Sequence, residues 1–151
     1  MQTQALSSSS DVVAIARYAV QASAGGGAVA IAQDVEDFFY VNRDWLASIA
    51  PRGARLGMLG GRGDSMEPTI SDGDVLIVTF DVTRQDLAAG GVFVFTYEGD
   101  IYLKRLSLAL DGSVQVISDN QSYPMQTIPA DVAEAKLEIN ARVIWAGGPL
   151  K

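Results

Sequence analysis

The order of apolar and polar positions along the chain predicts many short strands. The run Val75-Leu76-Ile77-Val78 is apolar and rich in β-branched side chains, so it indicates a buried strand. Glu98-Gly99-Asp100 and Asp111-Gly112 stand between apolar runs and predict tight hairpin turns. Strands are expected at residues 11–20, 29–32, 56–60, 74–80, 92–97, 101–106, 108–110, 114–117 and 135–145.

Helical signals are fewer. Residues 42–49 form a predicted short helix, with Asn42 as its N-cap and Pro51 after its end. Trp45, Leu46 and Ile49 have helical spacing within it, which is more typical of core packing than of a ligand site. Residues 83–89 form a polar turn or a second short helix. We therefore expect a mostly β, barrel-like fold with one or two short helices.

Composition limits the classes of protein to which the chain can belong. Its 151 residues are 48% hydrophobic and 19% charged, which predicts one globular domain with a real core. Eleven basic and 18 acidic residues give a net charge of −7. Because phosphate contacts need clustered Lys and Arg, the chain itself is expected to be a poor nucleic-acid binder.

The first ten residues differ from the rest. They are polar and contain the serine run 7–10, so we interpret residues 1–10 as a linker or a cloning remnant and residues 11–151 as the domain. They do not have the charged and apolar regions of a signal peptide. No apolar run approaches the roughly 20 residues that span a bilayer. With no cysteine in the sequence, these features favour a cytoplasmic protein without membrane contact.

Ser65 is the candidate nucleophile. It lies among glycines, acids and a proline just before the predicted strand 74–80, and this composition is typical of turns. A small hydroxyl on a tight turn at a sheet edge is exposed while its backbone is held, and neighbouring N–H groups can converge on one point. The alternative interpretation is that the segment is a turn without chemistry.

The general base for Ser65 must be a lysine, because the sequence contains no histidine and no cysteine. Lys151 is the last residue and is expected to be solvated, and Lys136 lies between acids that keep it charged. Lys104 lies in an apolar strand, where period-2 alternation puts Tyr102, Lys104 and Leu106 on one face and Arg105 on the other. If that face points inward, burial lowers the Lys104 pKa toward the range of a general base. The alternative is a lysine whose amine reaches out to water.

Together these segments resemble a known family. Gly63-Asp64-Ser65-Met66-Glu67-Pro68-Thr69, then Asp72-Gly73-Asp74 and Tyr102-Leu103-Lys104-Arg105, are similar to the LexA-type (S24) Ser-Lys peptidase domain, in the form found at the C-terminus of lambda CI-like phage repressors. Ser118-Asp119-Asn120-Gln121-Ser122-Tyr123-Pro124 and Val143-Ile144-Trp145-Ala146-Gly147 resemble two further segments of that family. The resemblance runs from about Tyr18 to the end of the chain and implies the LexA/signal-peptidase-like β-barrel-type fold.

The resemblance implies a self-cleaving domain of a transcriptional repressor. Ser65 is then the nucleophile and Lys104 the base, with the backbone N–H groups of Asp64 and Ser65 as the oxyanion hole. The scissile bond is Ala24-Gly25, on a loop whose three glycines allow a sharp bend. No metal or cofactor is needed, and Thr69 is expected to orient Lys104.

The family also implies partners. Cleavage is stimulated by RecA filaments after DNA damage, and operator DNA is bound only through an N-terminal domain that is missing here. A homodimer or higher homo-oligomer is expected through the closing strands at Val143-Ile144-Trp145. Three alternatives remain open. These are an oligomerisation module that has lost cleavage, a type I signal peptidase, against which the absent membrane anchor argues, and a damage-tolerance polymerase subunit of the same self-cleaving family.

Overall fold

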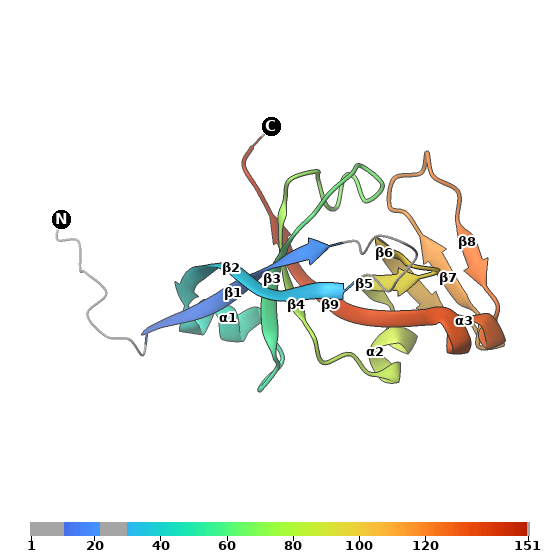
Figure 1. The fold of residues 1–151 in the computed structure, drawn as a ribbon, viewed down its shortest axis with the longest axis horizontal. Coiled ribbons are helices and arrows are strands. Elements are labelled where there is room, and N and C mark those ends of the chain that lie inside the picture. The colour runs from blue at the N-terminus through green and yellow to red at the C-terminus, as the bar shows by residue number, and fades with distance from the viewer. Residues whose placement is uncertain (1–10, 22–29, 151) are drawn as a thin grey trace.

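The computed structural model describes residues 11–21 and 30–150, which form one nine-stranded sheet with three short helices (Figure 1). The strand order is β2-β1-β3-β4-β9-β5-β6-β7-β8, and every pairing is antiparallel except that of β1 with β3. The predicted mostly β fold is confirmed. The elements are β1 (Val12–Gln21), β2 (Ala30–Asn42), α1 (Arg43–Ile49), β3 (Leu56–Gly60), β4 (Val75–Thr79), α2 (Arg84–Ala89), β5 (Gly91–Tyr97), β6 (Asp100–Leu108), β7 (Val114–Ile117), β8 (Gln126–Ile128), α3 (Ala130–Lys136) and β9 (Leu137–Gly147).

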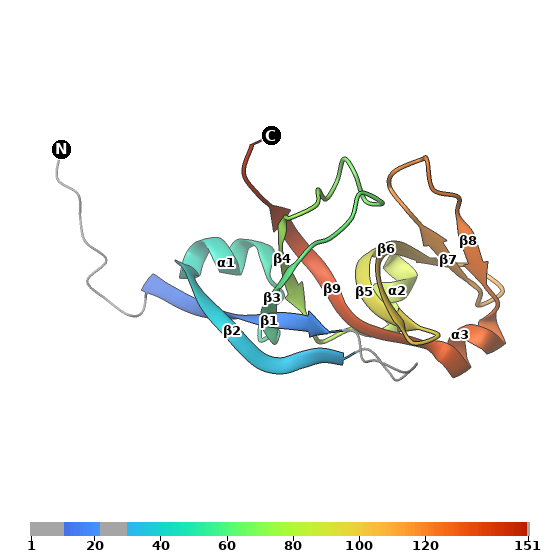
Figure 2. The ribbon, with the colours of Figure 1, turned by 45° about the horizontal axis from the view of Figure 1, so that its top comes forward.

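Strand β9 lies in the middle of the sheet and pairs with β4 on one side and β5 on the other (Figure 2). Most side chains of β4 and β5, the two neighbours of β9, are 5% exposed or less and fill the core. The continuous apolar runs in these strands predicted this burial. Val143 packs against one core cluster, and Ile144 and Trp145 pack against another. Dimerisation through these three residues stays a prediction.

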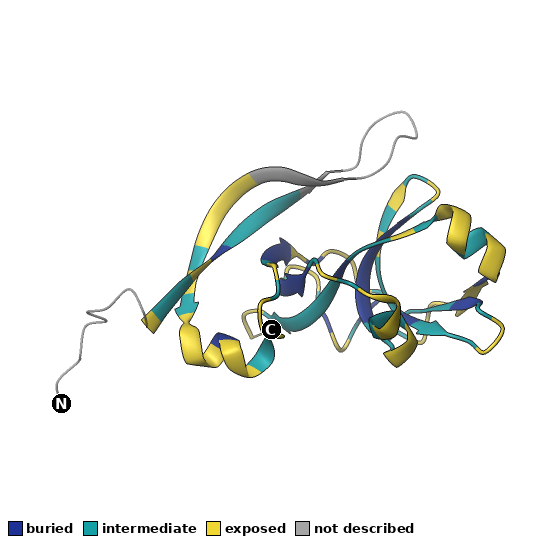
Figure 3. Cartoon of the chain, turned by 90° about the horizontal axis from the view of Figure 1, so that it is seen from below, coloured by how far each residue is buried: buried dark blue, intermediate teal, exposed yellow. Residues whose placement is uncertain are grey.

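Strands β1 and β2 form a long hairpin at one end of the sheet. Its register shifts at Tyr18. Its described part extends beyond the rest of the fold, and apart from the buried Ile15 the residues whose burial is described are half-buried or exposed (Figure 3). The expected strand at residues 29–32 was too short, because β2 continues to Asn42. The acids of residues 34–37 interrupted the apolar pattern, yet an edge strand tolerates charge on its solvent side.

The helices agree in part with the prediction. Asn42 caps α1 by accepting a hydrogen bond from the Trp45 N–H (2.9 Å), and residues 84–89 are helical as α2. The third helix was missed. Residues 135 and 136, expected to begin the last strand, instead end α3, and β9 starts at Leu137. The expected strand 108–110 is only the last residue of β6, Leu108, followed by a turn.

Within the ranges that the structure describes, no helix has the length and apolar character needed to cross a membrane.

Candidate active site

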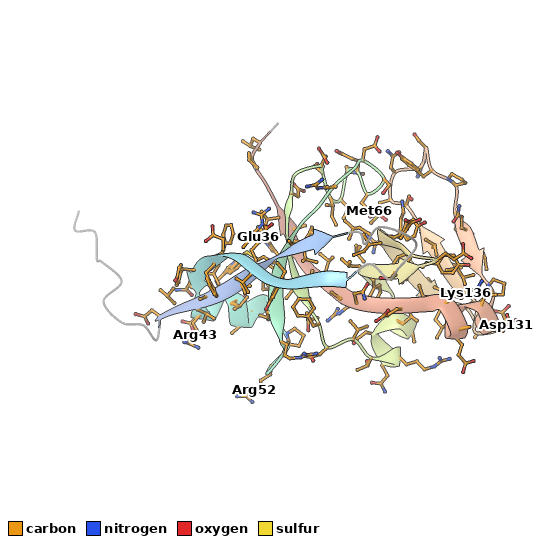
Figure 4. All side chains as sticks on the ribbon, in the orientation of Figure 1. Glu36, Arg43, Arg52, Met66, Asp131 and Lys136 are labelled. Atoms are coloured by element: carbon orange, nitrogen blue, oxygen red, sulfur yellow. The ribbon has the colours of Figure 1, made fainter. Side chains whose placement is uncertain are left out.

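Ser65 lies on the loop between β3 and β4. This loop is held by a hydrogen bond at its base and by buried side chains near its tip. At its base, the Gly61 N–H donates to the Asp74 carbonyl (2.8 Å). Met66, labelled in Figure 4, is 2% exposed and Ile70 is 3% exposed. Both belong to a core cluster, so they anchor the turn to the core. Ser65 itself is half-buried, between an exposed Asp64 and the buried Met66. The hydroxyl is therefore held close to the surface by a rigid backbone, as a nucleophile requires.

Gly63 begins this turn because the backbone there adopts a conformation that favours glycine. Gly63 has φ +84°, in the left-handed region that side chains disfavour, although a Cβ there would meet nothing within 4 Å. In this conformation its N–H donates to the Asp72 carboxylate (2.8 Å), which ties the two limbs of the loop together.

Lys104 projects from β6 into a half-buried position. Its neighbours on the same strand face confirm the predicted alternation, since Tyr102 stacks on Phe95 (5.6 Å between ring centroids) and Leu106 is fully buried. Burial lowers the pKa of Lys104 below its ordinary value, and the negative charge of Asp64 opposes that shift. This direction is the one expected for a lysine that acts as a general base.

A third segment, residues 118–123, joins the serine loop to the lysine strand. Lys104 Nζ donates to Ser118 Oγ (3.0 Å) and lies 5.3 Å from the centre of the Tyr123 ring. The Asn120 N–H donates to the Ser65 carbonyl (2.9 Å) and its side-chain amide donates to the Asp64 carbonyl (3.1 Å). The Tyr123 hydroxyl donates to the Asp64 carboxylate. Ser65 and Lys104 are far apart in sequence, and the contacts of residues 118–123 with both hold them at one site.

The two predicted partners are not hydrogen-bonded to each other within the described residues. Lys104 Nζ is hydrogen-bonded to Ser118 Oγ, and no hydrogen bond joins it to Ser65 Oγ in the part of the chain that the structure describes. Apo active sites often have long or poorly aligned catalytic hydrogen bonds, so this geometry is compatible with a general base.

Backbone geometry bears on the predicted oxyanion hole. The Asp64 carbonyl accepts hydrogen bonds from the Glu67 N–H (3.1 Å) and from the Asn120 side chain (3.1 Å). Because the C=O and N–H of a planar trans peptide point in opposite directions, the Ser65 N–H points away from both donors. Its direction is fixed before any substrate arrives, although its role, and that of the Asp64 N–H, stays a prediction.

One expected contact is replaced by another. Thr69 does not orient Lys104, because its hydroxyl donates to the Asp119 carboxylate. The same carboxylate accepts two hydrogen bonds from Arg105, at 2.9 and 2.8 Å. Arg105 points to the opposite face of β6 from Lys104, as predicted. Sequence reasoning assigned no role to Ser118, Asp119 or Asn120, although three polar residues directly after an apolar strand were a usable signal.

A cavity of about 380 Å³ is lined by Lys104, Ser118 and Tyr123. Its other walls carry Tyr102, Glu98 and residues of β7 and β8. Its volume lies within the range of ligand-binding clefts. Across residues 11–21 and 30–150, no group of His, Cys, Asp and Glu side chains is arranged to hold a metal ion. The predicted scissile bond, Ala24-Gly25, lies outside the described residues, in the connection between β1 and β2.

Comparison with known proteins agrees with this fold. The Peptidase S24-like family model matches residues 16–144, so the chain belongs to that family. A 26 kDa repressor protein of Escherichia phage HK022 is 39% identical over 83 residues, which cover 55% of this chain and 34% of the repressor. An uncharacterised HTH-type transcriptional regulator of Haemophilus influenzae is 27% identical over 106 residues, covering 70% of this chain and 43% of that protein. The chain thus spans less than half the length of these relatives.

Proposed function

We propose that this domain is the C-terminal part of a phage-type transcriptional repressor and that it cleaves its own chain with Ser65 and Lys104. Membership of the S24-like family and similarity to a phage repressor support the class of protein. The observation that carries the chemistry is the half-buried Lys104, whose pKa is lowered by burial, beside the anchored Ser65 turn.

The proposed reaction begins with neutral Lys104. Nζ takes the proton of Ser65 Oγ while Oγ bonds to the carbonyl carbon of Ala24, and the backbone N–H groups of Asp64 and Ser65 stabilise the oxyanion. Lys104 then gives that proton to the Gly25 nitrogen as the carbon–nitrogen bond breaks. Water next hydrolyses the ester, which releases the Ala24 carboxylate and restores the Ser65 hydroxyl. No step requires a metal or a cofactor.

The proposed regulation is the one that the resemblance to LexA-type repressors implies. A RecA filament acts as co-protease, the domain forms a homodimer or a larger homo-oligomer in the cytoplasm, and operator DNA is bound by a separate N-terminal domain. Cleavage at Ala24-Gly25 then separates the DNA-binding part of the repressor from the dimerising part. The two relatives are a repressor and a transcriptional regulator, which favours this proposal over a polymerase subunit.

A second candidate is an oligomerisation module that no longer cleaves. The observation that favours it is that Lys104 Nζ is hydrogen-bonded to Ser118 Oγ and, within the described residues, not to Ser65 Oγ.

The test is single-turnover self-cleavage measured from about pH 7 to 10, with a RecA filament added if the spontaneous rate is low. The rate should rise with pH and level off once Lys104 is neutral. Lys104→Arg should abolish cleavage because guanidinium stays protonated, and Ser65→Ala should match it because nucleophile and base act as a unit. Mass spectrometry should find a fragment that begins at Gly25.

Lys136→Ala is the matched control. Lys136 is 57% exposed and lies 3.7 Å from Glu98, in a different part of the molecule from Met66 on the serine loop (Figure 4), so its loss should leave the profile unchanged. Cleavage that persists in Lys104→Ala with the same pH profile would reject Lys104 as the base. No cleavage under any condition would favour the oligomerisation module.

A further inference from the structure

Ser118 is the hydrogen-bond partner of Lys104, and the two residues that follow it are also held by hydrogen bonds. Its half-buried hydroxyl accepts the Lys104 Nζ–H at 3.0 Å. The next residue, Asp119, is held by two hydrogen bonds from Arg105 and one from Thr69. Asn120, one further on, bonds the serine turn through both its backbone and its side chain.

Three consecutive side chains therefore contact three different parts of the site. The Ser118 side chain reaches the amine, Asp119 reaches the opposite face of the lysine strand through Arg105, and the Asn120 side chain reaches the Asp64 carbonyl while its backbone N–H reaches that of Ser65. A segment bound in this way sets the distance between β6 and the serine loop. We propose that Ser118 is a positioning residue for Lys104, and that residues 118–120 hold the lysine amine in register with the Ser65 hydroxyl.

The chemistry of an amine makes this position useful. A neutral amine has two N–H bonds and one lone pair, and only the lone pair can take the Ser65 proton. When Ser118 Oγ accepts one N–H, rotation of the amine is restricted and the lone pair has fewer directions to take. A single residue that restricts a base in this way contributes to rate through orientation. The proposal rests on the proposed self-cleavage, but the contact can also be tested without it.

The same bond should influence the charge of Lys104. An ammonium N–H makes a stronger hydrogen bond than a neutral amine does, so Ser118 stabilises the protonated form. The other groups that face Lys104 are Asp64 from the serine loop, the Tyr123 ring, and Tyr102, Tyr97 and Glu98 around the shared cavity. None of these is changed in Ser118→Ala, so the amine should lose its proton at a lower pH than in the wild-type chain.

The first experiment is a titration of the lysine Cε signals by NMR with ¹³C-labelled lysine. The sequence has only three lysines, and Lys104→Arg identifies the signal of Lys104. Ser118→Ala should move the Lys104 midpoint to lower pH, and Ser118→Thr, which keeps a hydroxyl, should leave it near the wild-type value. Ser122→Ala is the matched control, because it removes a serine hydroxyl from an exposed position of the same segment.

The second experiment measures the plateau rate of self-cleavage at high pH, where Lys104 is neutral in every variant. Ser118→Ala should lower this plateau by about a hundredfold, the loss expected for a misplaced catalytic group, while Ser118→Thr should recover most of it. Circular dichroism should show that all variants keep the fold.

The outcomes separate the two proposals. If nothing cleaves but the Lys104 midpoint moves in Ser118→Ala alone, the positioning contact stands and self-cleavage fails. If the wild-type chain cleaves and Ser118→Ala matches it in midpoint and plateau, the positioning role is wrong. Cleavage that survives in Ser65→Ala but is lost in both Ser118→Ala and Ser118→Thr would also overturn it, because Ser118 would then be the nucleophile.

Discussion

Removal of the Asp119 carboxylate should destabilise the fold by a measurable amount. Asp119 is 13% exposed and accepts two hydrogen bonds from Arg105 and one from Thr69. A hydrogen bond to a charged group contributes about 1.5–3 kcal/mol when buried, and bonds that share one carboxylate do not add fully. Because the Arg105 side chain is 40% exposed and can regain water, we expect Asp119→Ala to cost about 2 kcal/mol.

This loss should depend on pH. The hydrogen bonds from Arg105 lower the Asp119 pKa in the folded state below its ordinary value of 3.8. The stabilisation is therefore complete above the ordinary pKa and disappears as the pH falls through the lower, folded value. The difference between wild-type chain and Asp119→Ala should be largest near neutral pH and smaller at about pH 3.

Urea unfolding followed by tryptophan fluorescence is a suitable assay, because Trp45 and Trp145 meet edge to face at 5.7 Å in the fold. With a slope of roughly 2 kcal/mol per molar urea, a 2 kcal/mol loss lowers the midpoint by about 1 M. The matched comparison is Asp81→Ala, since Asp81 also pairs with an arginine, Arg55, but both side chains are largely exposed. Asp81→Ala should cost less. Equal midpoints for wild-type chain and Asp119→Ala at neutral pH, or a difference that is as large at low pH, would refute the reasoning.

Three further predictions use other parts of the fold. Gly57→Ala should destabilise it by about 1–3 kcal/mol, because the added Cβ would lie 2.7 Å from the Phe80 ring, and an unchanged urea midpoint would contradict this. Thr83→Ala should cost about 1 kcal/mol, because Thr83 and Asp86 form the capping box of α2, and retention of full stability in the same assay would show that the cap is unimportant. Light scattering at a protein concentration of tens of micromolar, roughly the range of modest dissociation constants, should detect a species larger than a monomer. A strict monomer at that concentration would contradict the proposed self-association.

Much of the fold followed from local patterns. The apolar runs predicted β4 and β5, whose side chains are almost fully buried, and the turn at Glu98-Gly99-Asp100 placed β6 beside β5. Asn42 was found as an N-cap because that signal is contained within four residues. Alternation along β6 also gave the correct faces for Lys104 and Arg105.

The parts that were missed depend on tertiary contacts. β8 has three residues, two of them exposed, and it exists because β7 pairs with it. Helix α3 consists largely of good helix formers, but it has seven residues, no side-chain cap and no fully buried residue, so the buried apolar face that marks an amphipathic helix is absent. The hydrogen-bond partner of Lys104 was missed because the contact is tertiary. Ser118 is 14 positions away along the chain, and only the pairing of β6 with β7 brings its hydroxyl to the amine.

The position of β9 has a consequence for how the chain acquires its fold during synthesis. Among the described strands, β1 to β4 are joined to β5 to β8 by strand pairing only through β9, which the ribosome makes after all of them. Until β9 emerges, β4 and β5 each have an unpaired edge, although both are strongly apolar. The long sequence separation between β4 and β9 also makes their pairing slow to form. The nascent chain therefore carries two incomplete half-sheets, and this interval is when it is most exposed to aggregation and most in need of a chaperone.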